Sequence, residues 1–201
     1  KIVINNLPID IEKIPHKNSY KLSNRINIGY SGRFVSWKGC DVLLKVVEKL
    51  SYRYPNIALH IYGSIESHYY GNDLFIKLLK SGNIVEYGIV DHPLLFEYLR
   101  DMDIYSFLSY SEGSAQSVKE AMAIGLPVVC TEASGSPIEN NVNGLICQNN
   151  MDNCYSAIID LLENDEKRST LGKAAREEIK NNHNGAKFLS ILKVILKKSY
   201  D

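Results

Sequence analysis

From Arg25 onward, short apolar runs alternate along the chain with segments whose apolar residues recur at helical spacing. Strands that alternate with helices in this way are typical of a parallel sheet covered by helices. The pattern therefore predicts an α/β fold with a Rossmann-like, parallel six-stranded sheet flanked by helices. The strands are expected at residues 26–30, 57–62, 84–87, 104–108, 128–130 and 145–147, and the helices between them at residues 41–52, 73–79, 93–100 and 115–124.

Three more helices are expected in the tail, at residues 152–163, 166–180 and 186–198. From Glu166 to Asp201 the chain has nine Lys or Arg residues against four Asp or Glu residues, so the last helix is both amphipathic and basic. Such a helix could lie on an anionic membrane surface or pack against its own domain. Its apolar side consists of Phe188, Leu189, Ile191, Leu192, Ile195 and Leu196.

The stretch SEGSAQSVKEAMAIGLP contains two carboxylates, Glu112 and Glu120, on either side of an expected helix start. Good helix formers follow Ser114, and Gly125 is a natural end for the helix. Free amides at a helix start favour a phosphate, and carboxylates accept hydrogen bonds from sugar hydroxyls. The stretch thus fits a ligand with a central diphosphate and a sugar at each end. The alternative is that Glu112 is a solvated acid and Glu120 a surface residue of an amphipathic helix.

The loop SGRFVSWKG, which follows the first expected strand, brings two cations to the same edge of the sheet. Gly32 permits close approach of the backbone, Arg33 can clamp phosphate oxygens with two hydrogen bonds, and Lys38 adds a point charge. These residues are the predicted diphosphate clamp. Taken alone, a loop Arg and Lys could equally be solvated surface charges.

The composition excludes several other classes of protein. Lys plus Arg and Asp plus Glu both total 23, so no overall positive field points to nucleic acid. The sequence has no 18-residue apolar run, and its start lacks the features of a signal peptide. Its four cysteines lack CxxC or zinc spacing, so we expect reduced core thiols in a cytoplasmic protein. They are Cys40, Cys130, Cys147 and Cys154.

Several of these stretches form a recognisable series. Two glutamates separated by seven residues are followed by AMA, a glycine and PVV. Upstream of them lie the stretches SGRFVSWKGCDVLLKVVEKL, IYG and VEYGIVDHPLLFEYLRDMDIYSFLSYSEG. Downstream lies VNGLIC. In this order they resemble the C-terminal donor-binding domain of glycosyltransferase family 4, a retaining group with the GT-B fold. The resemblance covers nearly every landmark of that domain. It implies an enzyme that transfers a sugar from a UDP- or GDP-linked donor.

The resemblance also implies roles for individual residues. Glu120 would hold the ribose of the donor and Glu112 the hydroxyls of the sugar to be transferred. Arg33 and Lys38, with the amides near residues 114–116, would bind the departing diphosphate. No metal or other cofactor is expected.

The loop at residues 88–91 would read the edge of the nucleobase, although it could also be an ordinary connection between a strand and a helix. The residues implied in catalysis are thus Glu112, Arg33 and Lys38. The residues implied in donor binding are Gly32, Ile89, Val90, Gly113, Ser114, Ala115, Gln116 and Glu120.

The same resemblance divides the chain into three parts. Residues 1–24 would be the last strand of a preceding N-terminal domain and the crossover from it, residues 25–185 the nucleotide-sugar-binding domain, and residues 186–201 a basic helix. That helix could also cross back to the N-terminal half. The acceptor would be a glycan or a lipid-linked acceptor, in bacterial capsule or lipopolysaccharide assembly, with possible peripheral contact at the inner face of the membrane. Without the N-terminal half, we expect donor binding but no transfer.

Some features depart from the family pattern. Ala115 stands where the family often has glycine or proline, Gln116 where it has an apolar residue, and TEASGSP is shorter than usual. Two other functions therefore remain open: another GT-B enzyme, such as a nucleotide-sugar epimerase, and a non-catalytic nucleotide-sugar-binding module. Asp101 and Asp103 form a DxD sequence, which binds a metal-nucleotide in another glycosyltransferase fold. Their place between a helix and a strand favours a structural role here.

Overall fold

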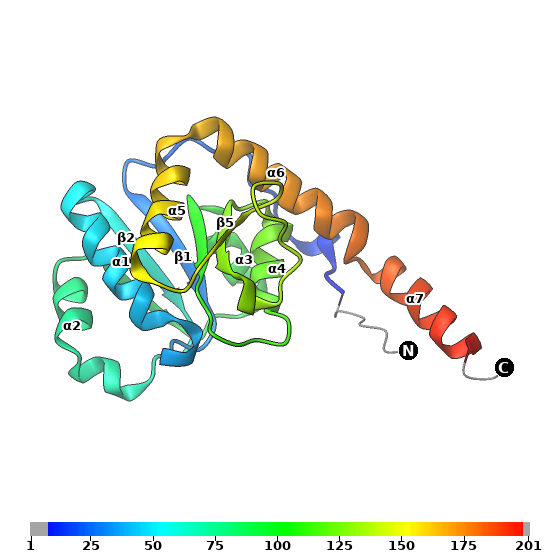
Figure 1. Cartoon of the computed structure of the whole chain (residues 1–201), viewed down its shortest axis with the longest axis horizontal. Coiled ribbons are helices and arrows are strands. Elements are labelled where there is room, and N and C mark those ends of the chain that lie inside the picture. The colour runs from blue at the N-terminus through cyan, green and yellow to red at the C-terminus, as the bar shows by residue number, and fades with distance from the viewer. Residues whose placement is uncertain (1–7, 199–201) are drawn as a thin grey trace.

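Six strands form one parallel sheet at the centre of the molecule (Figure 1). The computed structural model describes residues 8–198. The strand order is β3-β2-β1-β4-β5-β6, with every neighbouring pair parallel, so the predicted fold class is confirmed. Between β1 and β4 the order reverses, which is where open sheets of this kind bind ligands. The strands are β1 (Ile26–Ser31), β2 (Ile57–Tyr62), β3 (Ile84–Gly88), β4 (Ile104–Phe107), β5 (Val128–Thr131) and β6 (Leu145–Cys147).

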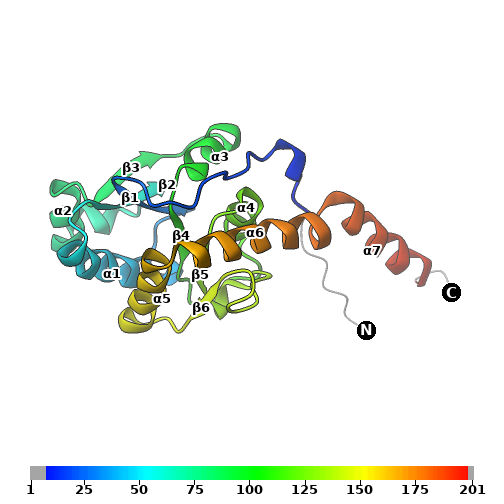
Figure 2. The same cartoon turned by 90° about the horizontal axis from the view of Figure 1, so that it is seen from above.

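Helices cover both faces of the sheet, with α1 and α5 on one side and α3 and α4 on the other (Figure 2). Helix α6 passes from α5 to α4 and packs on both. The α-helices are α1 (Cys40–Arg53), α2 (Asp73–Lys80), α3 (His92–Arg100), α4 (Gln116–Ile124), α5 (Met151–Glu163), α6 (Asp165–Asn182) and α7 (Gly185–Lys198). Short 3₁₀ helices are η1 (Ile11–Lys13), η2 (Ser36–Lys38), η3 (Ser67–Gly71) and η4 (Glu132–Ser134).

The element boundaries differ from the predicted ones by at most two residues. The starts of α5 and α6 are set by the side chains of Asn150 and Asn164, which accept hydrogen bonds from the amides of Asn153 and Lys167. Asparagine is a strong N-cap residue because its oxygen satisfies an amide that the helix leaves unpaired. Helix α4 begins at Gln116, one residue later than expected.

The sheet is buried on both faces, as expected for parallel strands between two helix layers. Every residue of β2, β4 and β5 is buried. The four cysteines are buried free thiols in this core. The interior therefore fixes the positions of the strand ends, where the loops begin.

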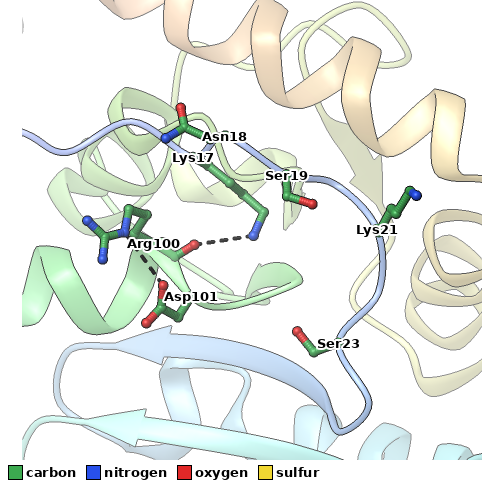
Figure 3. Close-up of a pocket in the computed structure, with 7 residues that line it drawn as sticks. All are labelled: Lys17, Asn18, Ser19, Lys21, Ser23, Arg100 and Asp101. Carbon is green, nitrogen blue, oxygen red and sulfur yellow. Dashed lines mark hydrogen bonds and ion pairs between the residues drawn. The ribbon is translucent and has the colours of Figure 1, made fainter.

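The segment before β1 is fastened to the far edge of the sheet by Lys17 (Figure 3). The Lys17 ammonium is buried and donates to the carbonyl oxygens of Arg100 (3.2 Å) and Met102 (2.6 Å) at the end of α3. A cation is favourable there because the last carbonyls of a helix carry a partial negative charge. Beside it is a hollow of about 370 Å³, also lined by Ser19 and Ser23.

Asp103 makes a second connection to the same segment. Its carboxylate accepts from the amide and hydroxyl of Ser23 (3.1 Å each) and from the amide of Asn27 (2.7 Å). Asp101 instead lies at the end of α3, beside Arg100. These contacts support the structural interpretation of the DxD sequence.

The start of the described chain meets the end of α6, where the Ile9 amide donates to the His183 carbonyl (2.8 Å). The strand predicted at the start of the chain falls in residues 1–7, outside the described residues. Helix α7 projects from the rest of the molecule, and its Leu189 and Leu192 are exposed. The idea that it packs against its own domain is therefore wrong. Among residues 8–198, no helix is long and apolar enough to span a bilayer.

His60 should make folding stability depend on pH. It lies in β2 between Asn27 (2.8 Å) and Tyr87 (3.1 Å), and burial lowers its pKa to about 4. The unfolded chain therefore binds more protons than the folded one between pH 6.5 and pH 4, so folding stability falls as the pH is lowered through that window. We expect a loss on the order of 1–3 kcal/mol between pH 7 and pH 4.5.

Urea unfolding at several pH values tests this expectation in the wild type and in His60→Gln, which lacks the titrating ring. The exposed His68→Gln is the matched control. The variant at position 60 should lose much of the pH slope and the control should keep it. Equal slopes in all three proteins would show that His60 does not cause the effect.

Candidate functional site

A cavity of about 320 Å³ opens where β1, β2 and β3 end, beside the first turns of α3 and α4. This is the edge of the sheet at which the loops that carry the predicted site residues were expected to meet. Five of the predicted donor-binding residues line it, namely Gly32, Ile89, Val90, Gln116 and Glu120. They come from two loops and from helix α4, which are far apart in sequence, so the fold itself assembles the cavity.

Glu120 forms the inner wall of this cavity from the second turn of α4. It is 7% exposed, so the alternative of a surface residue is wrong. Burial raises the pKa of its carboxyl group, and the nearby charges of His92 and Lys119 oppose that rise. A buried carboxylate facing a cavity can accept hydrogen bonds from ligand hydroxyls.

Lys38 and Glu112 form an ion pair at the border of the cavity. The distance from Lys38 Nζ to Glu112 Oε1 is 3.2 Å, and both side chains are largely buried. The Lys38 ammonium also lies 5.4 Å from the centre of the Phe107 ring. The Lys38 Nζ atom lies 3.8 Å from the position that a Cβ atom on Gly32 would occupy. The ammonium therefore adjoins the cavity that Gly32 lines. The structure thus brings two of the predicted catalytic residues together.

Arg33 is positioned differently from the other predicted cation. Its side chain is 56% exposed. Among the described residues, Arg33 does not line the cavity that contains Glu120. The guanidinium lies 5.2 Å from the centre of the Trp37 ring and 3.9 Å from a carboxylate oxygen of Glu66. Its backbone is fixed, because the buried Tyr30 hydroxyl donates to the Arg33 carbonyl (2.8 Å).

The start of α4 offers fewer amides than the sequence suggests. The Ala115 amide donates to the Ser134 carbonyl (2.9 Å), so the prediction that it binds phosphate is wrong. The first amide of α4 that donates within the helix is that of Lys119, to the Ala115 carbonyl. The amides from Gln116 to Val118 come before it, so they are available to donate to a ligand. The Ala115 backbone is in an ordinary extended conformation, so the departure from glycine or proline causes no distortion.

The turn before α4 contributes a further polar group. The Ser114 hydroxyl is buried and has no hydrogen-bond partner among the described residues. A buried hydroxyl without a partner is costly unless a ligand or water satisfies it. Donor binding by Ser114 and Gly113 stays a prediction; Gly135 packs on the Gly113 carbonyl.

Several residues of the site were not predicted from the sequence. His92 and Tyr62 line the cavity, as does Gly63, which directly follows β2. A side chain on Gly63 would overlap the Gly32 carbonyl, so these two loops approach each other closely. The glycine in IYG could have indicated this contact, because a glycine after a strand permits close backbone approach. His92 offered no comparable indication.

Ile89 projects from the loop after β3 and is 85% exposed, while Val90 is half-buried. The amide of Gly63 donates to the Gly88 carbonyl (2.7 Å), which fixes the start of this loop. Ile89 and Val90 thus present an apolar wall that could flank a planar ring. The site as a whole combines this wall, cations, a helix start and a buried carboxylate.

The family model described as "Glycosyl transferases group 1" matches residues 12–178. The chain therefore belongs to this family of glycosyltransferases. It is 27% identical over 177 residues to the capsular polysaccharide biosynthesis glycosyltransferase CapM of Staphylococcus aureus, covering 86% of this chain and 46% of CapM. The chain spans about half the length of the curated relatives it matches.

Two solved structures share the fold. The C-terminal domain of the group 1 glycosyl transferase LpcC from Francisella tularensis superposes with a TM-score of 0.76 at 19% identity, over 88% of this chain and 99% of that one. Anabaena HepE in complex with UDP and glucose gives a TM-score of 0.80 at 18% identity, over 96% of this chain and 56% of HepE. The fold is thus that of the C-terminal half of a GT-B glycosyltransferase.

Proposed function

We propose that this chain is the donor-binding domain of a retaining glycosyltransferase of family 4. It would bind a UDP- or GDP-linked sugar and act with an N-terminal domain that holds a glycan or lipid-linked acceptor. The observation that carries the proposal is the arrangement around the first turns of α4. There, buried Glu120 lines one cavity with Gly32, and the Lys38–Glu112 pair borders it.

Each end of the donor would meet a different carboxylate. Glu120, inside the cavity with Ile89 and Val90, would accept hydrogen bonds from the ribose hydroxyls while the base lies along the apolar wall. Glu112 would accept from hydroxyls of the transferred sugar. Its pairing with Lys38 keeps the carboxylate oriented, because the ammonium lies 3.2 Å away.

The diphosphate would lie between these ends. Lys38, Arg33, the Ser114 hydroxyl and the first free amides of α4 are all donors on this edge of the sheet. As the bond to the sugar breaks, negative charge accumulates on the leaving diphosphate, and donors fixed in advance lower the barrier. We propose that these groups neutralise the leaving group without a metal ion. Retention of configuration is proposed from the resemblance to family 4.

The setting we propose is assembly of a bacterial cell-surface polysaccharide in the cytoplasm, at the inner face of the membrane. The name of CapM connects one relative with capsular polysaccharide biosynthesis, and HepE has been solved with UDP and glucose. The exposed apolar residues of α7, Leu189 and Leu192, accompany basic residues and would suit peripheral contact with anionic lipid.

Binding of a nucleoside diphosphate is the first test. Calorimetry with UDP, GDP and their sugars should show one preferred nucleotide for the 201-residue chain. Lys38→Ala and Glu120→Ala should each weaken binding by roughly ten- to a hundredfold, since each removes a charge-assisted hydrogen bond. Lys49→Ala, which breaks an exposed pair with Asp152, is the matched control and should bind like the wild type. A folded wild type that binds none of these ligands would contradict the proposed function.

The pH dependence of nucleotide binding should report on Glu120. The carboxyl pKa is raised, so protonation begins at a higher pH than for an ordinary glutamate. The protonated form accepts fewer hydrogen bonds, so affinity should fall as pH is lowered from 7.5 to 5. Glu120→Gln should bind more weakly at pH 7.5 but lose much of this dependence. An unchanged pH profile in the variant would assign the titration to another group.

Sugar transfer should require more than this chain. We expect the 201-residue chain to bind donor without transferring sugar, because the groups described here hold the donor and leaving group. A radiolabelled donor assay with acceptor glycans, run beside a full-length relative as positive control, measures this. Robust transfer by the chain alone would show that it also binds the acceptor.

A further inference from the structure

The side chain of Arg33 is held by two contacts, although it is more than half exposed. An exposed arginine ordinarily samples many rotamers, and ordering it on a ligand costs conformational entropy. Here the guanidinium carbon lies 5.2 Å from the centre of the Trp37 ring, and a guanidinium nitrogen lies 3.9 Å from Glu66. Both contacts restrict the guanidinium before any ligand arrives.

The backbone of Trp37 is anchored by two hydrogen bonds, while the residue is 48% exposed. It lies in η2 directly before Lys38, and its carbonyl accepts from the Tyr110 amide (3.0 Å) and the Ser109 hydroxyl (3.3 Å). The same short turn therefore places the Lys38 ammonium and the ring under the Arg33 guanidinium. Lys38 and the ring that Arg33 contacts are thus neighbouring residues of one short turn.

Glu66 reaches Arg33 from the loop after β2. That loop pairs with the Arg33 loop through the Phe34 amide on the Ser64 carbonyl (2.8 Å) and the Glu66 amide on the Phe34 carbonyl (3.2 Å). The other oxygen of Glu66 lies 3.4 Å from a ring nitrogen of His68. At 3.9 Å the contact with Arg33 is longer than a charge-assisted hydrogen bond, so the guanidinium N–H groups are not committed to it.

We propose, on the basis of the donor-binding function proposed above, that Trp37 is a positioning residue that orients Arg33 for the diphosphate. A guanidinium stacked on an indole face is attracted by the ring quadrupole and keeps the N–H groups along its edges free to donate. Glu66 serves as a weak counter-ion until a phosphate replaces it. Trp37 acts through Arg33 and makes no direct contact with the ligand.

The chain contains one tryptophan and 13 tyrosines, so emission excited beyond the tyrosine absorption band reports on Trp37 alone. Titration with inorganic pyrophosphate, and separately with UDP, should change the emission of wild-type Trp37 as the guanidinium shifts on its ring. Arg33→Ala should remove most of that change at equal ligand occupancy. An identical change in Arg33→Ala would show that the emission does not report on the stacked guanidinium.

Calorimetry with the same two ligands measures the coupling between the residues. Trp37→Ala should weaken pyrophosphate binding by roughly two- to fivefold, the range for a partly exposed cation–π contact, and Trp37→Phe should restore part of the loss. In the Arg33→Ala background, Trp37→Ala should have no further effect. Tyr52→Ala is the matched control, because Tyr52 makes a cation–π contact with Lys77 on another part of the surface. The Lys77 ammonium lies 5.6 Å from the centre of the Tyr52 ring.

The outcomes separate this inference from the proposed function. Additive effects of the two substitutions, or wild-type affinity in Trp37→Ala, would overturn the positioning role while nucleotide binding stands. Pyrophosphate binding that shows the expected coupling, without any nucleotide binding, would support the positioning role and contradict the proposed nucleotide-sugar function. Absence of binding by any of the ligands would overturn both.

Discussion

Close contacts between glycines and carbonyl groups hold the loops of the site together, and the rest of the arrangement depends on them. A side chain on Gly39 would overlap the Leu108 carbonyl, and one on Gly63 would overlap the Gly32 carbonyl. Gly135 packs in the same way on the Gly113 carbonyl, where its Cβ would approach to 2.7 Å. Gly39, Gly63 and Gly135 all have positive φ angles, which other residues adopt only with strain. Loops from separate strands can therefore approach closely enough to bring their charges to one edge.

The charges that the loops carry are balanced within the site. Lys38 is paired with Glu112, Arg33 lies beside Glu66, and Glu120 is influenced by His92 and Lys119. Pairing lowers the cost of burying a cation in the absence of a ligand. It also means that an arriving anion competes with a carboxylate of the protein, so affinity depends on how weak each internal pair is. At a separation of 3.9 Å, the ion pair between Arg33 and Glu66 is weak enough for an anionic ligand to replace the Glu66 carboxylate.

Much of this site could be predicted from the sequence. The apolar runs located all six strands, and the spacing of Glu112 and Glu120 around a helix start placed both at the edge of the sheet where the cavity opens. What could not be predicted depends on how the loops and short turns fold and which of them meet. The Ala115 amide is occupied by the Ser134 carbonyl, and the stacking of Arg33 on Trp37 depends on how the short η2 turn is folded. Local patterns predict elements and exposed edges, but they carry no information on which loop neighbours which.

The far end of α4 is held as firmly as its start. The Tyr20 hydroxyl donates to the Gly125 carbonyl (2.9 Å), and Arg176 from α6 donates to the Ala123 carbonyl. Gly172 of α6 packs so closely on the Gly125 carbonyl that a side chain on it would overlap that oxygen and the Tyr20 ring. Gly125, Gly172 and Tyr20 thus form one packing unit, although they are widely separated in the sequence. A side chain larger than hydrogen at position 172 would therefore have to displace the Tyr20 ring or the carbonyl that ends α4, and the segment before β1 would move with that ring.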